Sequence, residues 1–320
     1  MAKAAKRVDE KRTRIKTKDG WIQNIQNSWQ LYIMIIIPLV YILVFKFYPM
    51  YGAIIAFKDF SVTKGIWGSE WVQFKHFVRF FSTPRCMQYI VNTVAISTYS
   101  IIVSFPLQVG FAIALNYVNR KWVKKSVQLV SYMPHFISTV IIVSMLNMLF
   151  DNRTGVLDSI LELITGHQVD ILGNPAYFRS LYVWSGIWQN LGWSSILYLS
   201  ALSGVSPELH EAARIDGANK WQRVWHVDLM GILPTIAITM IMNVGHVLSV
   251  GFDKTFLMQN ATNLKISETL ATYGYKIGIG SAFPEYSYSS AIGLMSALAT
   301  LFLVTCANRI VNKMTGTGLW

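Results

Sequence analysis

One polar segment, residues 206–222, lies between two long apolar runs and brings together acidic, basic, histidine and amide side chains that could form specific interactions. The segment reads SPELHEAARIDGANKWQ, so acidic, alanine and glycine residues lie close together. Ser206 is a favoured N-cap and Pro207 a favoured first helical residue. Gly217 suits the left-handed conformation that often follows a helix end. The segment therefore predicts a short capped helix rather than an irregular connection.

Several side chains of this helix suit contact with another protein. Its alanines would let a second backbone approach closely; they are Ala212, Ala213 and Ala218. Gly217 permits a tight turn. Glu211 and Asp216 can form charge-assisted hydrogen bonds across an interface. For Glu208, in the first turn, a simple interaction with the helix dipole explains the residue equally well.

The run Glu-Ala-Ala-x-x-x-Gly at 211–217 resembles the EAA loop of binding-protein-dependent ABC importer permeases. The longer string EAARIDGANKWQRVWHVDL, residues 211–229, is similar to the maltose-type, oligosaccharide branch of that family. Family members usually continue with Ile-x-Leu-Pro, whereas this chain has Met230 where the proline is expected. The next proline is Pro234, and the departure concerns the local bend of the chain.

The resemblance implies a role for the helix in energy coupling. It would be the coupling helix that docks on a cytosolic ATPase subunit, through Glu208, Glu211, Ala212, Ala213, Asp216, Gly217 and Ala218. The fold implied is the all-α, six-span type I ABC importer permease. ATP and Mg²⁺ would bind to two ATPase partners, with no cofactor on this chain, which would be a permease rather than an enzyme.

Further partners follow from the same resemblance. A second permease subunit, usually a different chain in this branch, would complete the pathway. A periplasmic or lipid-anchored solute-binding protein would deliver a sugar or oligosaccharide and dock on the outside loops, including the aromatic region 60–85. Within the branch the chain is similar to permeases for complex polysaccharides, including those of alginate importers, so an acidic cargo is among the expectations.

The family also suggests where the sugar passes. One part of the pathway would lie in the span before the EAA loop, at Trp188, Gln189, Asn190, Gly192, Trp193 and Ser194. A second part would lie in the following span, at Asn243, His246 and Ser249. Aromatic faces suit sugar rings and amides suit hydroxyl groups. The alternative is that these residues are interfacial aromatics and helix-to-helix hydrogen-bonding groups. His135 is interpreted as an ordinary interior histidine.

No motif for catalysis or for a metal is present in the sequence. It contains no G-x-x-x-x-G-K-[ST], no H-E-x-x-H and no G-x-S-x-G. Cys86 and Cys306 form no CxxC pair and no Cys/His cluster has zinc spacing. ATP hydrolysis must therefore belong to a partner, and a membrane-embedded enzyme or assembly scaffold is disfavoured.

The composition indicates a membrane protein. The 320 residues are 53% hydrophobic and 14% charged, with a mean hydropathy of +0.39, whereas soluble domains average about 25% charged residues. Six apolar stretches approach the roughly 20 residues that a spanning helix needs. They are 31–48, 90–117, 127–150, 181–202, 232–252 and 290–310.

The distribution of basic residues predicts the orientation. Placing the N-terminus in the cytosol puts 17 Lys and Arg inside and 10 in the outside loops, which is the positive-inside asymmetry. It accounts for most of the net charge of +12, so a nucleic-acid partner is disfavoured. The expected protein is a multi-pass component of the bacterial inner membrane with both termini cytosolic. It comprises a tail (1–30), one domain (31–310) with the coupling loop 203–231, and a C-terminus (311–320).

A secondary transporter or channel for a polar solute is the alternative. Such proteins usually need ionisable residues deep in their spans, and Lys46 lies at the end of a span. In the first outside loop, Trp71, Phe74, Phe77 and Phe81 recur at helical spacing. They suit either an amphipathic helix on the outer interface or a short packed cap.

Overall fold

The computed structural model describes residues 28–151, 154–167, 169–248, 251–316 and 318–320. The predicted basic tail therefore lies almost wholly outside the described residues, as does Ser249. What is described is nearly all helical. A two-residue antiparallel pairing joins β1 (Lys58–Asp59) to β2 (Glu70–Trp71).

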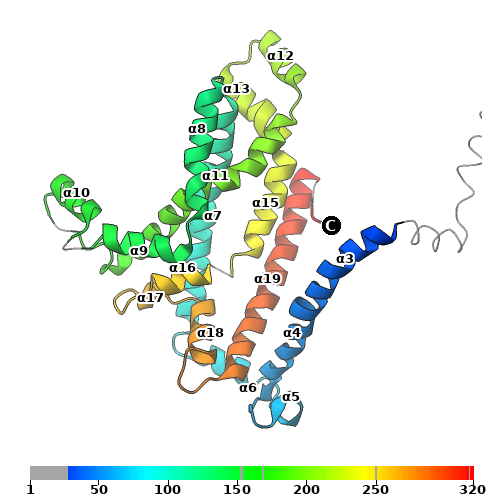
Figure 1. Cartoon of the computed structure of the whole chain (residues 1–320), viewed down its shortest axis with the longest axis vertical. Coiled ribbons are helices and arrows are strands. Elements are labelled where there is room, and N and C mark those ends of the chain that lie inside the picture. Colours follow the sequence, from blue (N-terminus) through cyan, green and yellow to red (C-terminus); the bar gives the residue numbers. More distant parts are fainter. Residues whose placement is uncertain (1–27, 152–153, 168, 249–250, 317) are drawn as a thin grey trace, which may run out of the picture.

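The first apolar helix stands apart from the others, as the blue ribbon of Figure 1 shows. It comprises α3 (Trp29–Ile42), a π-helical turn (Leu43–Phe47), α4 (Tyr48–Met50) and a 3-10 turn (Tyr51–Phe57), and no residue of α3 is buried. Its 3-10 turn packs against α19 (Tyr286–Thr315), which is the main contact of this helix with the rest of the protein.

The other long helices form a bundle. Helix α7 (Cys86–Asn116) packs along α11 (Phe178–Ser203), with α8 (Lys121–Tyr132) beside them, and α15 (Leu233–Gly245) lies against α19 (Figure 1). Buried side chains on α7, α11 and the start of α15 form one apolar core between these helices; they are Val109, Ala112, Tyr198, Leu202 and Ile232.

Length and hydropathy identify three helices of the described chain as able to cross a membrane: Trp29–Phe57, Cys86–Asn116 and Tyr286–Thr315. The number rises to five if two bent helix pairs each count as one span. Helix α11 is not among them, although it lies in the bundle, because its serines, amides and glycines lower its mean hydropathy. The structure thus supports several membrane helices.

The span expected at 127–150 is sharply bent in the structure. The chain follows α8, passes through a 3-10 turn (Met133–Phe136) and turns by 98° into α9 (Thr139–Leu149). Pro134 has no N–H to continue the helical pattern. Ser138 then caps α9 by accepting a hydrogen bond from the Ile141 N–H at 3.4 Å. Similarly, the span expected at 232–252 is helical only to Gly245.

The end of the protein opposite α12 (Pro207–Ile215) is a packed aromatic cap formed by the hairpin, α5 (Gly65–Gly68) and α6 (Lys75–Phe81) (Figure 1). The Phe57 ring lies 5.8 Å from Trp71 and contacts two further rings, Phe74 and Phe77. Trp71 is in a strand rather than on a helix, which favours the packed-cap alternative.

Ion pairs brace this cap. Lys75 Nζ lies 3.0 Å from Asp59 Oδ2, and this hydrogen bond lowers the pKa of the Asp59 carboxyl. Arg79 pairs with Glu285 just before α19, and that contact raises the pKa of the guanidinium. Both pairs are about half exposed, so each contributes little to stability.

Shorter helices complete the described chain. They are α10 (Val156–Thr165), a 3-10 turn (Pro175–Tyr177), α16 (Phe252–Leu257), α17 (Leu264–Ser267) and α18 (Leu270–Gly278). Helix α18 packs against α19, and α16 packs against both α9 and α18. Helices α16, α17 and α18 lie on the side of the aromatic cap, whereas α10 projects to one side of the bundle (Figure 1).

Candidate coupling surface and translocation cavity

The predicted capped helix is present as α12 (Pro207–Ile215). Ser206 Oγ accepts a hydrogen bond from the Glu208 N–H at 3.2 Å. Gly217 has φ of +79°, the left-handed conformation expected after the helix end. The Ala218 N–H then donates to the Ala213 carbonyl at 2.8 Å, which closes the turn. Local capping chemistry therefore builds this helix as the sequence indicates.

The predicted coupling residues form one accessible surface at the end of the molecule, where Figure 1 shows α12 projecting from the bundle. The side chains of Glu208, Glu211 and Asp216 are exposed, and no ion pair engages them within the described chain. Beside them is a shallow groove of about 290 Å³, lined by Ala213, Asp216, Gly217, Ala218, Gln222, His226 and Val227. Ile215 is 87% exposed at its edge.

The chain after α12 forms a second helical arm that leads into the bundle. It comprises α13 (Lys220–Arg223), a π-helical turn (Val224–Asp228) and α14 (Leu229–Gly231), and it meets α15 at an angle of 65°. The bend is present although Met230 replaces the usual proline. A Cβ on Gly231 would lie 2.7 Å from Val205 Cγ2, so glycine permits the close approach at this bend.

Asp228 links the coupling helix to the bundle, a role that the sequence did not reveal. Its side chain is 0% exposed. One carboxylate oxygen accepts a hydrogen bond from the Tyr117 hydroxyl, at the end of α7, at 2.7 Å. The other lies 3.3 Å from His210 Nε2 on α12. A signal was present, because Asp228 is a charged residue between apolar neighbours, but its partners are distant in sequence.

The predicted pathway residues of two helices meet at two adjoining cavities. A cavity of about 340 Å³ is lined by Gln189 and Asn190 of α11, and one of about 260 Å³ by Asn243 and His246 of the α15 end. The two cavities share a boundary formed by Ser100, Ser104, Tyr182 and Gly251. Their lining is rich in neutral hydroxyl and amide groups, which suits a polyhydroxylated ligand.

The amides at the first cavity are held by the break between α8 and α9. Gln189 Nε2 donates to the Ile137 carbonyl at 3.0 Å. Asn190 Oδ1 accepts from His135 Nδ1 at 2.9 Å, while its Nδ2 donates to the Gly186 carbonyl at 3.1 Å. His135 therefore orients a predicted pathway residue, and the interpretation as an ordinary interior histidine missed this contact.

An aromatic stack lies next to these amides. The rings of His135 and Trp193 are parallel within 4°, with centroids 4.5 Å apart, and Phe136 meets Trp193 edge-on at 5.6 Å. Trp193, which is 45% exposed, Trp188, which is 51% exposed, and Ser194 line neither cavity. The structure thus divides the predicted pathway residues of α11 into two cavity-lining amides and neighbours that lie outside.

Gly192 holds α11 against α8. It is buried, and a Cβ there would overlap the Ser131 carbonyl. We expect Gly192→Ala to lower the free energy of unfolding by about 1–3 kcal/mol, as overpacking does, and to lower the melting temperature of the detergent-solubilised protein. Gly110→Ala is the matched control, because a Cβ at Gly110 on α7 meets nothing within 4 Å. Equal melting temperatures for the two variants would contradict this packing role.

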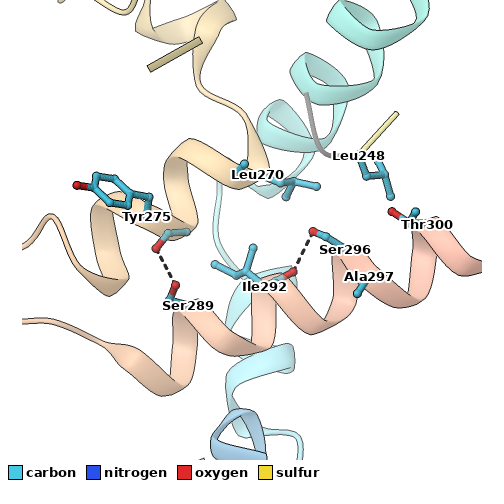
Figure 2. A pocket seen from close by; sticks show the side chains of 11 residues that line it. Leu248, Leu270, Tyr275, Ser289, Ile292, Ser296, Ala297 and Thr300 are labelled. Atoms are coloured by element: carbon cyan, nitrogen blue, oxygen red, sulfur yellow. Dashed lines mark hydrogen bonds between the residues drawn. The ribbon is translucent and has the colours of Figure 1, made fainter. Parts of the chain in front are cut away.

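A third cavity, of about 360 Å³, lies between α18 and α19 and contains none of the predicted residues. Figure 2 shows its lining, which combines apolar side chains such as Leu248, Leu270 and Ile292 with the hydroxyl groups of Tyr275, Ser289, Ser296 and Thr300. Ser289 donates to the Gly274 carbonyl at 2.8 Å and Ser296 to the Ile292 carbonyl at 2.9 Å.

A bundle of apolar helices with a polar interior cavity and an exposed helix projecting from one end fits a membrane permease (Figure 1). Residues 108–315 match the family described as "Binding-protein-dependent transport system inner membrane component". The chain belongs to this family, and it is a transporter component rather than an enzyme.

Similar proteins cover almost the whole chain. The "Polygalacturonan/rhamnogalacturonan transport system permease protein YteP" of Bacillus subtilis (strain 168) is 38% identical over 95% of this chain and 94% of its own length. A crystal structure of a bacterial ABC transporter for import of the acidic polysaccharide alginate contains a chain with 33% identity and a TM-score of 0.84, covering 92% of this chain and 99% of that one. The complex of the alginate transporter with its alginate pentasaccharide-bound periplasmic protein contains a chain with the same identity and TM-score. That match covers 93% of this chain and 99% of the other.

Proposed function

We propose that this chain is one permease subunit of an ABC importer for a sugar or oligosaccharide. The observation that carries the proposal is the meeting of neutral amide and hydroxyl groups of α7, α11 and the α15 end at two adjoining cavities. Its relatives support the cargo class, since one is named for polygalacturonan and rhamnogalacturonan and another imports alginate. All three of these polymers contain acidic sugars, so an acidic oligosaccharide is the leading candidate.

In this proposal the chain crosses the inner membrane six times with both termini in the cytosol. The spans are the three long apolar helices, the two bent pairs and α11. The excess of basic residues in the loops on the side of α12 supports this orientation. The six spans form a single domain over residues 31–310, preceded by the basic tail 1–30 and followed by a short C-terminus, 311–320.

ATP and Mg²⁺ act on two partner ATPases in this scheme, and α12 transmits the movement. Glu208, Glu211 and Asp216 are exposed and lack ion-pair partners in the described chain, so they are available to donors on an ATPase surface. Ala213, Gly217 and Ala218 line the adjoining groove, where a partner backbone can approach. Closure of the ATPases would then move α12 and, through Asp228, the end of α7.

The remaining partners are a second permease and a solute-binding protein, periplasmic or anchored to a lipid. The aromatic cap at the outer end, with Trp67 80% exposed and Phe74 63% exposed, is the proposed docking surface for the binding protein. The alginate transporter in complex with its loaded periplasmic protein provides a precedent in a similar chain.

ATP hydrolysis by the complete complex in lipid vesicles tests this function. The chain is co-expressed with the second permease, the ATPases and the binding protein encoded beside it. We expect hydrolysis to rise several-fold when the binding protein carries its oligosaccharide, and labelled oligosaccharide to accumulate inside the vesicles only with ATP. If no ATPase copurifies, or if accumulation follows an ion gradient without ATP, the importer assignment is wrong.

A further inference from the structure

A lysine lies in the wall of the first cavity. Lys254 of α16 is 8% exposed, and its Nζ donates to the Tyr182 carbonyl of α11 at 2.9 Å. The same ammonium lies 4.9 Å from the centroid of the Tyr182 ring. A Cβ on Gly186 would approach Nζ to 3.2 Å, so glycine leaves room for the ammonium between the two helices.

Among the described residues, the surroundings of Lys254 supply no negative charge. Neither cavity has an acidic residue in its lining. Helices α7 and α9 contain no Asp, Glu, Lys, Arg or His. The acidic Glu268, next to α18, pairs instead with Lys276 at 3.0 Å. Asp253 is the sequence neighbour of Lys254, but its side chain is exposed and no described ion pair joins the two.

A buried ammonium without a counter-ion is costly, and in membrane proteins such groups usually mark a substrate or ion pathway. An ammonium can donate three hydrogen bonds, and the described structure accounts for one of them, to Tyr182. The cavity beside it offers the hydroxyl groups of Ser100 and Ser104 and the amides of Gln189 and Asn190. One fixed cation among neutral polar groups is the arrangement that suits a sugar bearing a carboxylate.

We propose that Lys254 is the charge-selecting residue of the pathway and that it pairs with the carboxylate of a uronic-acid-containing oligosaccharide as this cargo occupies the cavity. The inference rests on the proposed function and extends it, since it assigns selection by charge to the permease rather than to the binding protein alone. A purely structural lysine, which only joins α16 to α11, would affect acidic and neutral sugars alike.

Equilibrium binding separates these roles. Tri-galacturonate and its neutral methyl ester are titrated onto the assembled complex in lipid nanodiscs, without the binding protein, and binding is followed by tryptophan fluorescence. We expect the wild type to prefer the acid. Lys254→Gln should raise the Kd for the acid about tenfold or more, the lower end of the range for hydrogen bonds to charged groups, and leave the Kd for the ester within about twofold. Lys254→Arg should retain the preference.

Lys265→Gln is the matched control, because it removes the same charge from an exposed neighbouring position that lines neither cavity. It should change neither constant. The inference is overturned if wild type shows no preference for the acid, if it binds neither compound, or if Lys254→Gln weakens both compounds equally. ATP-driven uptake by the wild-type complex is measured separately. If the complex takes up sugar but Lys254 has no role in binding the acid, this inference is wrong and the proposed function still holds.

Discussion

Glu211→Ala should abolish most of the stimulation of ATP hydrolysis by the loaded binding protein while the complex still assembles in the membrane. Glu211 is exposed on α12 and has no ion-pair partner in the described chain, so its removal should leave the permease fold unchanged and delete the proposed contact to the ATPase. We expect stimulation to fall about tenfold, the scale for loss of a charge-assisted hydrogen bond. The measurement is the ATPase rate in lipid vesicles with and without loaded binding protein.

The turn after α12 provides an independent variant of the same test. Gly217 has a φ of +79°, a conformation that β-branched residues disfavour, so Gly217→Val should be strained. Asparagine adopts this conformation more readily, so Gly217→Asn should be tolerated. We expect the valine variant to lose stimulation and the asparagine variant to keep most of it. Glu162→Ala, on an exposed site of α10, is the control for Glu211→Ala. Normal stimulation in both Glu211→Ala and Gly217→Val would refute the role of α12 in coupling.

Asp228→Leu should destabilise the protein by about 1–3 kcal/mol, the cost of leaving the part-buried Tyr117 hydroxyl without its hydrogen-bond acceptor. The substitution leaves the Tyr117 hydroxyl and the His210 imidazole without the carboxylate that they contact. The expected results are a lower melting temperature in detergent and faster tryptic cleavage at Arg214, because α12 is no longer held to the bundle.

A double-mutant cycle with Tyr117→Phe measures whether the hydrogen bond between Tyr117 and Asp228 accounts for the loss of stability. Once Asp228 is replaced by leucine, the further loss of the Tyr117 hydroxyl should cost little or even restore some stability. Asp228→Asn, which keeps the shape and one acceptor oxygen, should lie between wild type and Asp228→Leu. Strict additivity of Asp228→Leu and Tyr117→Phe would show that the two side chains do not act together.

Local chemistry explains what the sequence predicted well. The coupling helix follows from the Ser206 cap, Pro207 and Gly217, all within a dozen residues, and the structure has each of these features in place. The general position of the apolar helices follows in the same way from hydropathy. Hydropathy does not indicate how a helix bends, however. The sequence therefore could not distinguish the 98° bend near Pro134 from the small kink that a proline causes in a continuous span.

Tertiary contacts explain what the sequence did not predict. His135 and Asn190 are 55 residues apart in the chain, and Tyr117 and Asp228 are 111 apart. No local pattern pairs such residues, and each alone resembles an ordinary interior polar group. The cavity depends in the same way on the approach of α16 to α11, which is why Lys254 was counted as a loop residue when the sequence was considered by itself.

The isolation of α3 has a consequence for biogenesis. A helix with no buried residue gains nothing from the bundle at the moment of insertion, because its own backbone hydrogen bonds already satisfy it in lipid. The translocation machinery can therefore release this span into the bilayer while the rest of the chain is still being synthesised. The helix can then serve as an early anchor, and its main contact with the rest of this chain, made by the 3-10 turn at Tyr51–Phe57 against α19, can form later.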